Sequence, residues 1–393
     1  MTLPTHPIRD TVDPVLTWRP GSTPTIRYID IGSIDRVRRR VTFPSETDAE
    51  SAPSRAKYIL EADDILVSLV RPNLNAVASV TTELRGAIGS SGFAVLRPRK
   101  GVLDSRYLFH WVCTENFVQE MVRLSTGATY PAVTSDQVLS SELPLPPLAE
   151  QRRIAAILDK ADALRRKRQE AIALTEQLLR STFLEMFGDP VTNPKRWPTR
   201  PLGELITDGP TNGLYRPASD YGSGTPIIRI DAIQKGQVQE IDTLKRLRIP
   251  DELIAKFSLT EGDLLVNRVN SPDLLGKIAL ISGLAEATVY ESNMMRFRVN
   301  QTTILPEYLT TLWQTPFLST QIARRRKDAS NQSSINQGDV QSFEVHIPPI
   351  DLQRAFRSVV RRLSHHERLS SAALTDADTL FNALTHRAFT GQL

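Results

Sequence analysis

The chain has almost no cysteine and no long apolar run, and each absence excludes a class of protein. Its 393 residues include a single cysteine, Cys113, which excludes an internal disulfide and a multi-cysteine metal site. No apolar run approaches the ~18–20 residues that a membrane span requires. The segment MTLPTHPIRDTVDP at the start lacks the apolar core of a secretory signal. We therefore expect a cytoplasmic protein that does not contact a membrane.

Catalytic motifs are absent as well. The nearest match to the Asn-Pro-Pro-aromatic motif of amino-methyltransferases, Asn-Pro-Lys-Arg at 193–196, fails at its last two positions and is typical of a turn. The segment LLGKIA at 274–279 lacks the first glycine and the Ser/Thr of a phosphate loop. No Asp or Glu is followed two residues later by Lys, a common metal-dependent nuclease pattern. His365 and His366 have no thiols nearby and are better explained as solvated or partner-facing than as metal ligands. We predict a protein with no catalytic residues and no metal.

The overall composition, 40% hydrophobic and 23% charged residues, is typical of a globular protein. Its length favours about two to three domains. The formal net charge of +4 is weak support for a nucleic-acid partner, because many enzymes carry a similar excess. Arg is preferred over Lys, and its planar fork suits phosphate oxygens and guanine edges. The arrangement of these side chains must therefore decide the question.

The chain repeats itself once. EADDILVSLVRPN at 61–73 resembles TEGDLLVNRVNSP at 260–272, so that Asp64 and Asp263 lie 199 residues apart. Three further pairs keep the same order in both halves: YIDIGSID at 28–35 with IRIDAIQKG at 228–236, SRYLFHWV at 105–112 with PEYLTTLW at 306–313, and SSELPLPPLAEQRRIAAIL at 140–158 with SFEVHIPPIDLQRAFRSVV at 342–360. A duplication explains this order. Each half is a globular part followed by a helix.

The globular parts combine strands and helices. Apolar runs of strand length, bounded by Gly, Asn and Pro, predict strands at Ile65–Val70, Ala76–Val80, Phe93–Leu96, Leu264–Val266, Ile278–Ile281 and Met295–Val299. Helical spacing with basic residues at the end predicts a helix at 105–124 and another at 306–326. The pattern indicates one mixed α/β domain that occurs twice.

The helix that ends each half is far longer than the usual ~11–12 residues. Its apolar stripe extends over about 36–40 residues, or ~55–60 Å. The stripe residues are Ile154, Ile157, Leu158, Ala161, Leu164, Ile172, Leu178, Leu179, Phe183 and Met186 in the first helix, and Leu352, Phe356, Val359, Val360, Leu363, Leu369, Ala373, Ala377, Leu380 and Leu384 in the second.

Such a stripe needs a packing partner. If a pseudo-two-fold axis relates the halves, the helices run antiparallel and bury their stripes against each other, with the globular domains at opposite ends. The alternative is two independent domains that each wrap their own helix. We favour the antiparallel pair, because the stripe is too long for one domain of this size.

These segments also carry a family resemblance. LPPLAEQRRIAAILDKADALRRKRQEA, FLEMFGDPVTNPKRWP, SRAKYILEADDILVSLVRPNLNAVA and the terminal FTGQL are similar to motifs of the specificity (S) subunit of type I DNA restriction-modification systems. The resemblance covers essentially the whole chain. It implies an α+β fold with two target-recognition domains, at 1–148 and 189–350, and two long antiparallel coiled-coil helices, at 149–188 and in 351–393 with the C-terminal tail.

The resemblance also implies partners. The family's two recognition domains each read one half of an interrupted double-stranded DNA target. Two methyltransferase (M) subunits dock on the helices, and motor-nuclease (R) subunits join them. S-adenosylmethionine, ATP and Mg²⁺ are expected on those partners, and no cofactor on this chain. Candidate docking residues on the helices are Arg153, Arg165, Arg166, Arg168, Arg361 and Arg362. The run RRKR at 165–168 could instead contact the DNA backbone, but a solvated or partner-docking surface is favoured.

Base reading needs Arg, Lys, Asn or Gln side chains that reach the groove, together with contacts to phosphates. Such residues follow apolar strands or lie on small-residue loops in both halves, although each loop alone could be merely solvated. The candidates in the first half are Arg71, Asn73, Asn75, Arg97, Arg99, Lys100 and Tyr130. Those in the second are Tyr215, Arg216, Asn267, Arg268, Asn270, Lys327, Asn331 and Gln332. Because the loops differ between the halves, we predict an asymmetric bipartite target.

Three functions compete at this point. A DNA-recognition subunit without catalysis, of a restriction-modification or a modification-only system, fits the motifs and the paired loops. A standalone methyltransferase or nuclease is disfavoured by the missing motifs. A coiled-coil adaptor that binds no nucleic acid would not need Asn- and Arg-bearing loops in both halves.

Overall fold

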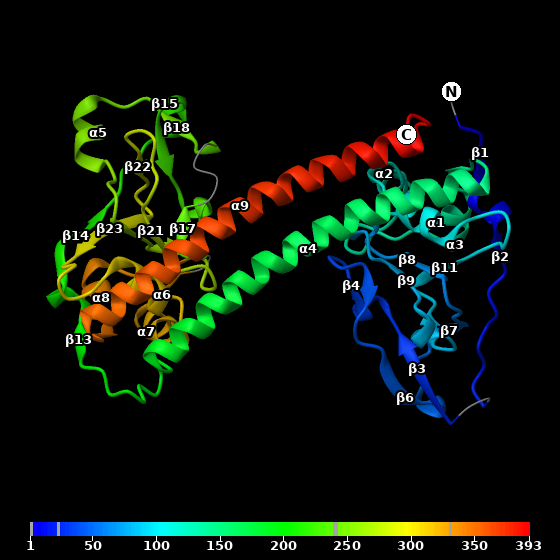
Figure 1. Cartoon of the computed structure of the whole chain (residues 1–393), viewed down its shortest axis with the longest axis horizontal. Helices are drawn as coiled ribbons and strands as arrows, with labels where there is room; N and C mark the ends of the chain where they lie inside the picture. The colour runs from blue at the N-terminus through cyan, green and yellow to red at the C-terminus, as the bar shows by residue number, and fades with distance from the viewer. Residues whose placement is uncertain (1–2, 22–23, 239–242, 330–331) are drawn as a thin grey trace. The chain divides into compact units, whose positions relative to one another are not determined.

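The computed structural model describes residues 3–21, 24–238, 243–329 and 332–393. The chain divides into two units, the first formed by Met1–Ile172 with Ser370–Leu393 and the second by Ala173–Leu369 (Figure 1). The two longest helices, α4 (Leu148–Phe187) and α9 (Ile350–Phe389), have 40 residues each. The first unit therefore contains the beginning of α4 and the end of α9, and the second contains the opposite ends.

The described part of the first unit is built around two four-stranded sheets, in the orders β6-β3-β10-β7 and β2-β11-β8-β9. Their strands are β2 (Val12–Asp13), β3 (Thr25–Ile29), β6 (Ser45–Asp48), β7 (Ala56–Ile59), β8 (Ile65–Ser68), β9 (Val77–Ser79), β10 (Ile88–Ser90) and β11 (Phe93–Pro98). Two short pairs are β1 (Thr5–Pro7) with β12 (Glu142–Pro144), and β4 (Ile34–Asp35) with β5 (Arg40–Val41). The helices are α1 (Ser105–Val112), α2 (Glu115–Leu124) and α3 (Ser135–Ser140).

The second unit repeats this plan with additions. Its larger sheets have the orders β14-β23-β19-β21 and β18-β15-β22. Their strands are β14 (Ile206–Asn212), β15 (Tyr221–Ile228), β18 (Arg246–Leu247), β19 (Leu264–Asn267), β21 (Ile278–Leu280), β22 (Val289–Tyr290) and β23 (Met294–Val299). Smaller sheets join β13 (Thr199–Pro201) to β26 (Glu344–His346), β16 (Ile233–Gln234) to β17 (Gln237–Val238), and β20 (Val269–Asn270), β25 (Ser333–Ser334) and β24 (Lys327–Asp328). The helices are α5 (Asp251–Phe257), α6 (Pro306–Trp313), α7 (Pro316–Arg325) and α8 (Gln337–Gln341).

The predicted strands are confirmed as β8, β9, β11, β19, β21 and β23. The two predicted helices at 105–124 and 306–326 are wrong in one respect, because each is a pair of shorter helices. In the first unit, α1 ends at Val112, and Thr114 caps α2 by accepting a hydrogen bond from the Phe117 N–H. In the second, Pro316 starts α7, since it cannot donate within a continuing helix.

The Pro-Pro segment before each long helix precedes a buried glutamine that attaches the helix to its globular part. It brings a glutamine, Gln151 in α4 and Gln353 in α9, to the fifth position after the first proline, where the side chain is fully buried. Each amide accepts one backbone N–H and donates to two backbone carbonyls, at 2.8–3.0 Å. The partners are Asp104 N, Val102 O and Pro146 O for Gln151, and Leu305 N, Thr303 O and Pro348 O for Gln353. The same bonds therefore fix each helix to its own globular part.

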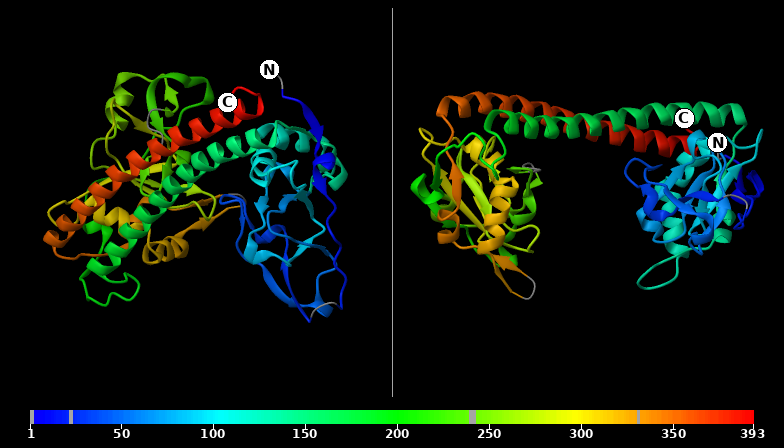
Figure 2. Two further views of the ribbon diagram at one scale, coloured as in Figure 1. Left: turned by 45° about the vertical axis from the view of Figure 1, so that its right-hand side comes forward. Right: turned by 90° about the horizontal axis from the view of Figure 1, so that it is seen from below.

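In each unit, the ends of the two long helices run antiparallel and pack together, and the sheets lie to one side of them (Figure 2). In the first unit, Ala388 of α9 is buried in the same core as Ile154 of α4. In the second, Phe183 and Phe187 of α4 pack edge-on against Phe356 of α9 at 5.6 and 5.3 Å. The alternative in which each domain wraps only its own helix is therefore wrong.

The predicted burial of the whole stripe is also wrong. Leu164, Leu178, Leu369 and Leu380 belong to the predicted stripe, yet their side chains are exposed. Burial is concentrated where each helix crosses the core of a unit, because there the sheets and short helices add apolar partners. Of the helices in the described residues, none combines the length and apolarity that a membrane crossing requires.

Candidate nucleic-acid interface

In the first unit, two segments that are distant in sequence form one surface beside β8. Arg71 follows the strand in a left-handed conformation with φ of 51°, and its N–H donates to the Pro131 carbonyl at 2.7 Å. This bond places the loop at 125–132 against the turn Pro72–Leu74. The Arg71 guanidinium lies 4.7 Å from the centre of the Tyr130 ring, and Tyr130 is 65% exposed. We call Arg71, Asn73 and Tyr130 the first patch.

The other predicted residues of the first unit are more constrained. The Asn75 side chain donates to the Cys113 carbonyl at 3.2 Å, which orients the turn. Arg97 forms two 2.8 Å hydrogen bonds with the fully buried Asp64 carboxylate. These bonds raise the pKa of Arg97 and hold its side chain inside the unit. Nε and Nη2 of Arg97 bond to Asp64 and to the Ile59 carbonyl, so Arg97 has a structural role, and a DNA contact by Arg97 stays a prediction.

The remaining two residues form a basic corner after β11. Arg99 pairs with Asp13 at 3.1 Å and donates to the Asp10 and Val12 carbonyls. Lys100 is exposed and makes no hydrogen bond or ion pair with the described residues. Arg99 is thus mainly a structural residue, whereas Lys100 remains a candidate for a phosphate contact.

In the second unit, Asn267 is wrong as a predicted DNA contact. It lies on β19 at 0% exposure, and neither atom of its side-chain amide has a hydrogen-bond partner among the described residues. Its neighbour Arg268 is partly exposed and donates to the Ser292 carbonyl at 3.2 Å. The Arg268 N–H also donates to the Asn293 carbonyl at 2.8 Å. The segment 291–293 is thereby attached to the predicted reading loop.

A small sheet extends this surface. Asn270 in β20 pairs with Ser333 in β25, and β25 pairs in turn with β24, which carries Lys327. Lys327 and Gln332 are exposed, and neither side chain bonds to a described residue. Asn331 lies outside the described residues. The three-stranded sheet therefore presents polar side chains from two distant parts of the chain.

Tyr215 and Arg216 join the same surface from the other side. Ser292 N–H donates to the Leu214 carbonyl at 2.9 Å, which sets the loop with these residues beside segment 291–293. Tyr215 is 78% exposed, whereas Arg216 is paired with Asp220 at 2.7 Å. We call Tyr215, Arg268, Asn270, Asn293 and Lys327 the second patch. Asn293 was not predicted to contact DNA. The sequence indicates it only by the polar segment Glu-Ser-Asn between two apolar runs.

Most of the helix arginines that were predicted to dock partners make ion pairs or hydrogen bonds in the structure. Their side chains are nevertheless partly accessible to solvent. The contacts are Arg153 to Glu150, Arg165 to Asp162 and Asp378, Arg166 to Asp162, Arg361 to Glu307, and Arg362 to the Ser358 carbonyl. Arg168 is exposed and makes no contact of this kind with the described residues. These helices have a second feature that was not predicted, the exposed leucines Leu164, Leu174, Leu178, Leu184, Leu369 and Leu380.

The interface shows no sign of a metal centre. Among the residues that the structure describes, no group of three or more His, Cys, Asp or Glu side chains could hold an ion. His365 and His366 are exposed, and the His366 Nδ1 lies 3.4 Å from the Thr175 hydroxyl. The two patches therefore offer hydrogen-bonding and cationic groups, which can bind a polyanion and read its edges.

Comparison with known proteins supports the resemblance. Residues 24–174 match the type I restriction modification DNA specificity domain. The chain is 26% identical over 316 residues to the type I restriction enzyme EcoKI specificity subunit of Escherichia coli (strain K12), an alignment that covers 76% of this chain and 68% of that protein.

Two solved structures share the fold. One is a chain from "Structural basis underlying complex assembly and conformational transition of the type I R-M system", with a TM-score of 0.55, 23% identity and coverage of 100% of this chain and 98% of that one. The other is the S subunit of a type I system from M. genitalium, with a TM-score of 0.62, 13% identity and coverage of 99% and 96%. At these identities the likeness shows the fold alone, and the α+β prediction is confirmed.

Proposed function

Because this chain belongs with the specificity subunits of type I restriction-modification systems by motifs, family match and fold, we propose that it recognises the DNA target of such a system. The observation that supports this most is that the two units share their scaffold bonds and differ in their exposed patches. Both units place polar side chains directly after the equivalent strands β8 and β19. Arg and Asn at such positions suit both phosphate contacts and base edges.

The target is bipartite and asymmetric in this proposal. The two units pair their backbones in a similar way at this place, Val70 and Thr126 with Ala132 in the first and β20 and β24 with β25 in the second. Their side chains differ, because the first patch combines a guanidinium with a stacked phenol and the second carries Asn270 and Lys327. Two readers of different chemistry on one duplicated scaffold recognise two different half-sites. Identical readers would instead favour a palindrome.

Catalysis is assigned to partners. Methyltransferase and motor-nuclease subunits would bind S-adenosylmethionine, ATP and Mg²⁺, and this chain would bind none of them. The exposed leucines of α4 and α9 suit methyltransferase docking, because apolar side chains ringed by arginines are typical of a protein interface. In each unit, arginines would contribute the polar part of the docking surface: Arg153, Arg165, Arg166 and Arg168 in the first, and Arg361 and Arg362 in the second.

The test is to produce the chain with a candidate methyltransferase subunit, purify the complex and sequence the methylated DNA of the host. We expect co-purification and one interrupted, asymmetric methylated motif that disappears without the chain. The chain alone should transfer no methyl group, hydrolyse no ATP and cleave no DNA. A copurifying partner without any methylated motif would favour a non-DNA adaptor, and methylation without a nuclease partner would favour a modification-only system.

A further inference from the structure

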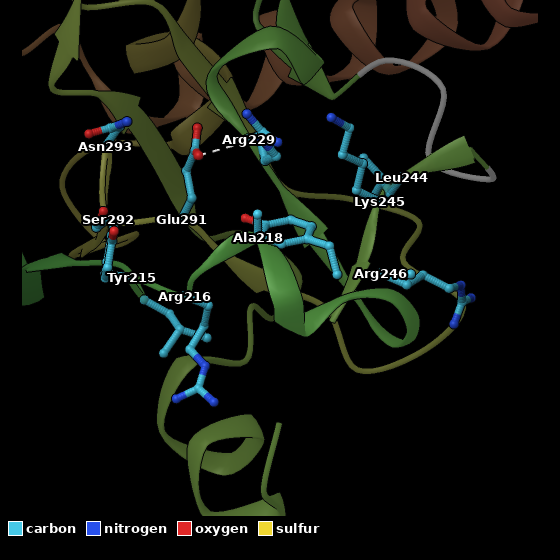
Figure 3. Close-up of a pocket in the computed structure, with 13 residues that line it drawn as sticks. Tyr215, Arg216, Ala218, Arg229, Leu244, Lys245, Arg246, Glu291, Ser292 and Asn293 are labelled. Carbon is cyan, nitrogen blue, oxygen red and sulfur yellow. Dashed lines mark ion pairs between the residues drawn. The ribbon is translucent and has the colours of Figure 1, made fainter. Parts of the chain in front are cut away.

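The second unit contains a pocket that adjoins the second patch. Its volume is about 750 Å³, within the ~300–1,000 Å³ usual for small-ligand sites. Figure 3 shows Glu291 and Arg229 facing each other at its centre, with Tyr215 and Ser292 on one side and Leu244 and Lys245 on the other. This mixture of a carboxylate, cations and phenol rings needs an explanation beyond scaffold stability.

The carboxylate of Glu291 is held in a fixed orientation. Its Oε1 accepts the Ile230 N–H at 2.6 Å, and its Oε2 lies 3.5 Å from Arg229 Nε. Only 11% of the Glu291 side chain is exposed, and this burial raises the pKa of Glu291. Arg229 Nε is buried and donates no hydrogen bond to a described residue. Arg229 Nε is therefore enclosed beside Glu291, and the pair presents to the pocket the exposed part of the Glu291 carboxylate and the rest of the Arg229 guanidinium, whose side chain is 31% exposed.

As far as the described residues show, the walls provide aromatic faces and one cation that forms no ion pair. The Arg229 guanidinium lies 5.7 Å from the centre of the Tyr221 ring, and Tyr215 is largely exposed at the edge of the pocket. Arg216 and Arg246 are neutralised by Asp220 and Glu286, respectively. Lys245 is exposed and forms no ion pair with the described residues. A phosphate could therefore be bound by Lys245, and a ring could stack on a tyrosine.

The duplication shows that the fold does not require these groups. Ile228 pairs with Tyr290 in the second unit as Ile29 pairs with Gly89 in the first. Arg229 directly follows Ile228, and Glu291 directly follows Tyr290. The corresponding positions in the first unit are therefore Asp30 and Ser90, and Asn293 corresponds to Gly92. In the first unit, Asp30 caps a short helix and Ser90 is buried. Because the scaffold folds with Asp30 and Ser90 at these positions, it does not require the Glu291–Arg229 pair.

We propose that this pocket binds one unstacked nucleotide, with its base against Tyr215 or Tyr221, its edge read by Glu291 and Asn293, and its phosphate at Lys245. The inference rests on the proposed function, because the pocket is continuous with the second patch through the bonds between Arg268 and segment 292–293. The nucleotide is either splayed from bound DNA or free. A carboxylate accepts hydrogen bonds from exocyclic amino groups, so bases that carry one are preferred over thymine.

The first test measures binding of dAMP, dCMP, dGMP, dTMP and inorganic phosphate to the full chain by calorimetry. We expect at least one amino-bearing nucleotide to bind about fivefold or more tightly than dTMP. Glu291→Gln keeps the acceptor for Ile230 but adds a donor that thymine can accept, so this preference should fall below about twofold. Lys245→Ala should weaken all four nucleotides alike. Lys256→Ala, on α5 and outside the pocket lining, is the matched control and should change nothing.

Equal binding of the four nucleotides, phosphate binding as tight as that of any nucleotide, or a preference that survives Glu291→Gln would each overturn the proposal. Thermal unfolding of each variant shows whether it is folded.

The second test uses the methylated target with 2-aminopurine at each position of the second half-site. A fluorescence rise on binding identifies the nucleotide as a splayed DNA base, and a preference without a rise identifies it as free. Normal methylation without nucleotide binding would refute this inference and leave the proposed function intact.

Discussion

The two units share their internal bonds and differ at their exposed loops. Asp64 and Asp263 are both fully buried, both accept a backbone N–H at 2.8 Å, and both are bridged by an arginine from the neighbouring strand. Gln151 and Gln353 make three equivalent bonds each. In contrast, the segments that pair as Thr126 with Ala132 in the first unit and as β24 with β25 in the second carry different exposed side chains, among them Tyr130 and Lys327. The groups that hold the helices and strands are thus the same in both units, and those that face outward differ.

One internal contact shows how much freedom the scaffold has. Arg106 of α1 pairs with Asp159 of α4 at 2.5 Å in the first unit. At the equivalent positions of the second unit, Glu307 of α6 pairs with Arg361 of α9 at 3.3 Å. The charges are exchanged while the pair is kept. The position therefore requires opposite charges on the short and long helices, and not a particular residue on either.

The largest expected effect comes from changing the long helices. The contacts Arg165–Asp378 in the first unit and Thr175–His366 in the second lie on either side of Gln169. One heptad inserted after Gln169 and one after Ala373 add about 10 Å, or about three base pairs, and nearly preserve the helix faces. We expect both half-sites to be retained and the spacer of the methylated motif to lengthen, or binding to weaken.

Two-residue insertions at the same places are the contrasting variant. They rotate the helix faces by about 200° and should prevent the helix pair from forming. Sequencing of methylated DNA reads out both variants. Full activity with an unchanged spacer after the heptad insertion would show that the helices do not set the spacing.

The next effect concerns the buried aspartates. Replacing Asp64 by Ala leaves Arg97, only 20% exposed, without its partner, and should cost about 3–5 kcal/mol. Asp263→Ala should cost less, because its partner Arg298 is 41% exposed and can be hydrated. Hydrogen exchange on β8 and β19 measures each unit separately. Equal losses in both units would contradict the explanation from exposure.

A smaller effect is expected at the exchanged ion pair. Arg106→Glu places like charges together and should destabilise the first unit by about 1–3 kcal/mol. The double variant Arg106→Glu with Asp159→Arg recreates the pair of the second unit but removes the carboxylate that bonds to the buried His110 at 2.8 Å, so it should recover only part of that loss. Chemical unfolding of the full chain measures both. A double variant no more stable than the single one would show that Arg106 and Asp159 do not act as a pair.

Much of the fold could be predicted from the sequence because apolar runs and repeats are local signals. The strands β8 and β19 were predicted from apolar runs that follow Asp64 and Asp263. The duplication was predicted because several pairs of similar segments are separated by nearly the same number of residues. The breaks at Thr114 and Pro316 were missed, because helical spacing continues across both positions. The exposed leucines were missed for a related reason, since a stripe shows which face is apolar and not whether anything covers it.

The candidate interface was only partly predictable. Arg71 and Tyr130 lie 59 residues apart, and nothing local indicates that they stack. Arg97 was interpreted as a DNA contact because its bond to Asp64 depends on the register between β8 and β11, which the sequence does not show. Asn267 was misassigned because an amide at the end of a buried strand and one in a following loop look alike in sequence. Tertiary pairing decides which polar residues remain free.

The central claim, that each unit reads its own half-site, is tested most directly by sequencing methylated DNA from cells that produce single variants with the partner subunits. Arg71→Ala should relax the bases of one half-site, and Asn270→Ala those of the other, with a cost of about 1–3 kcal/mol for each lost base contact. The spacer and the opposite half-site should stay unchanged, and Lys256→Ala should leave the whole motif intact. If either patch variant relaxes both half-sites, or if neither changes the motif, the account of two independent readers is wrong.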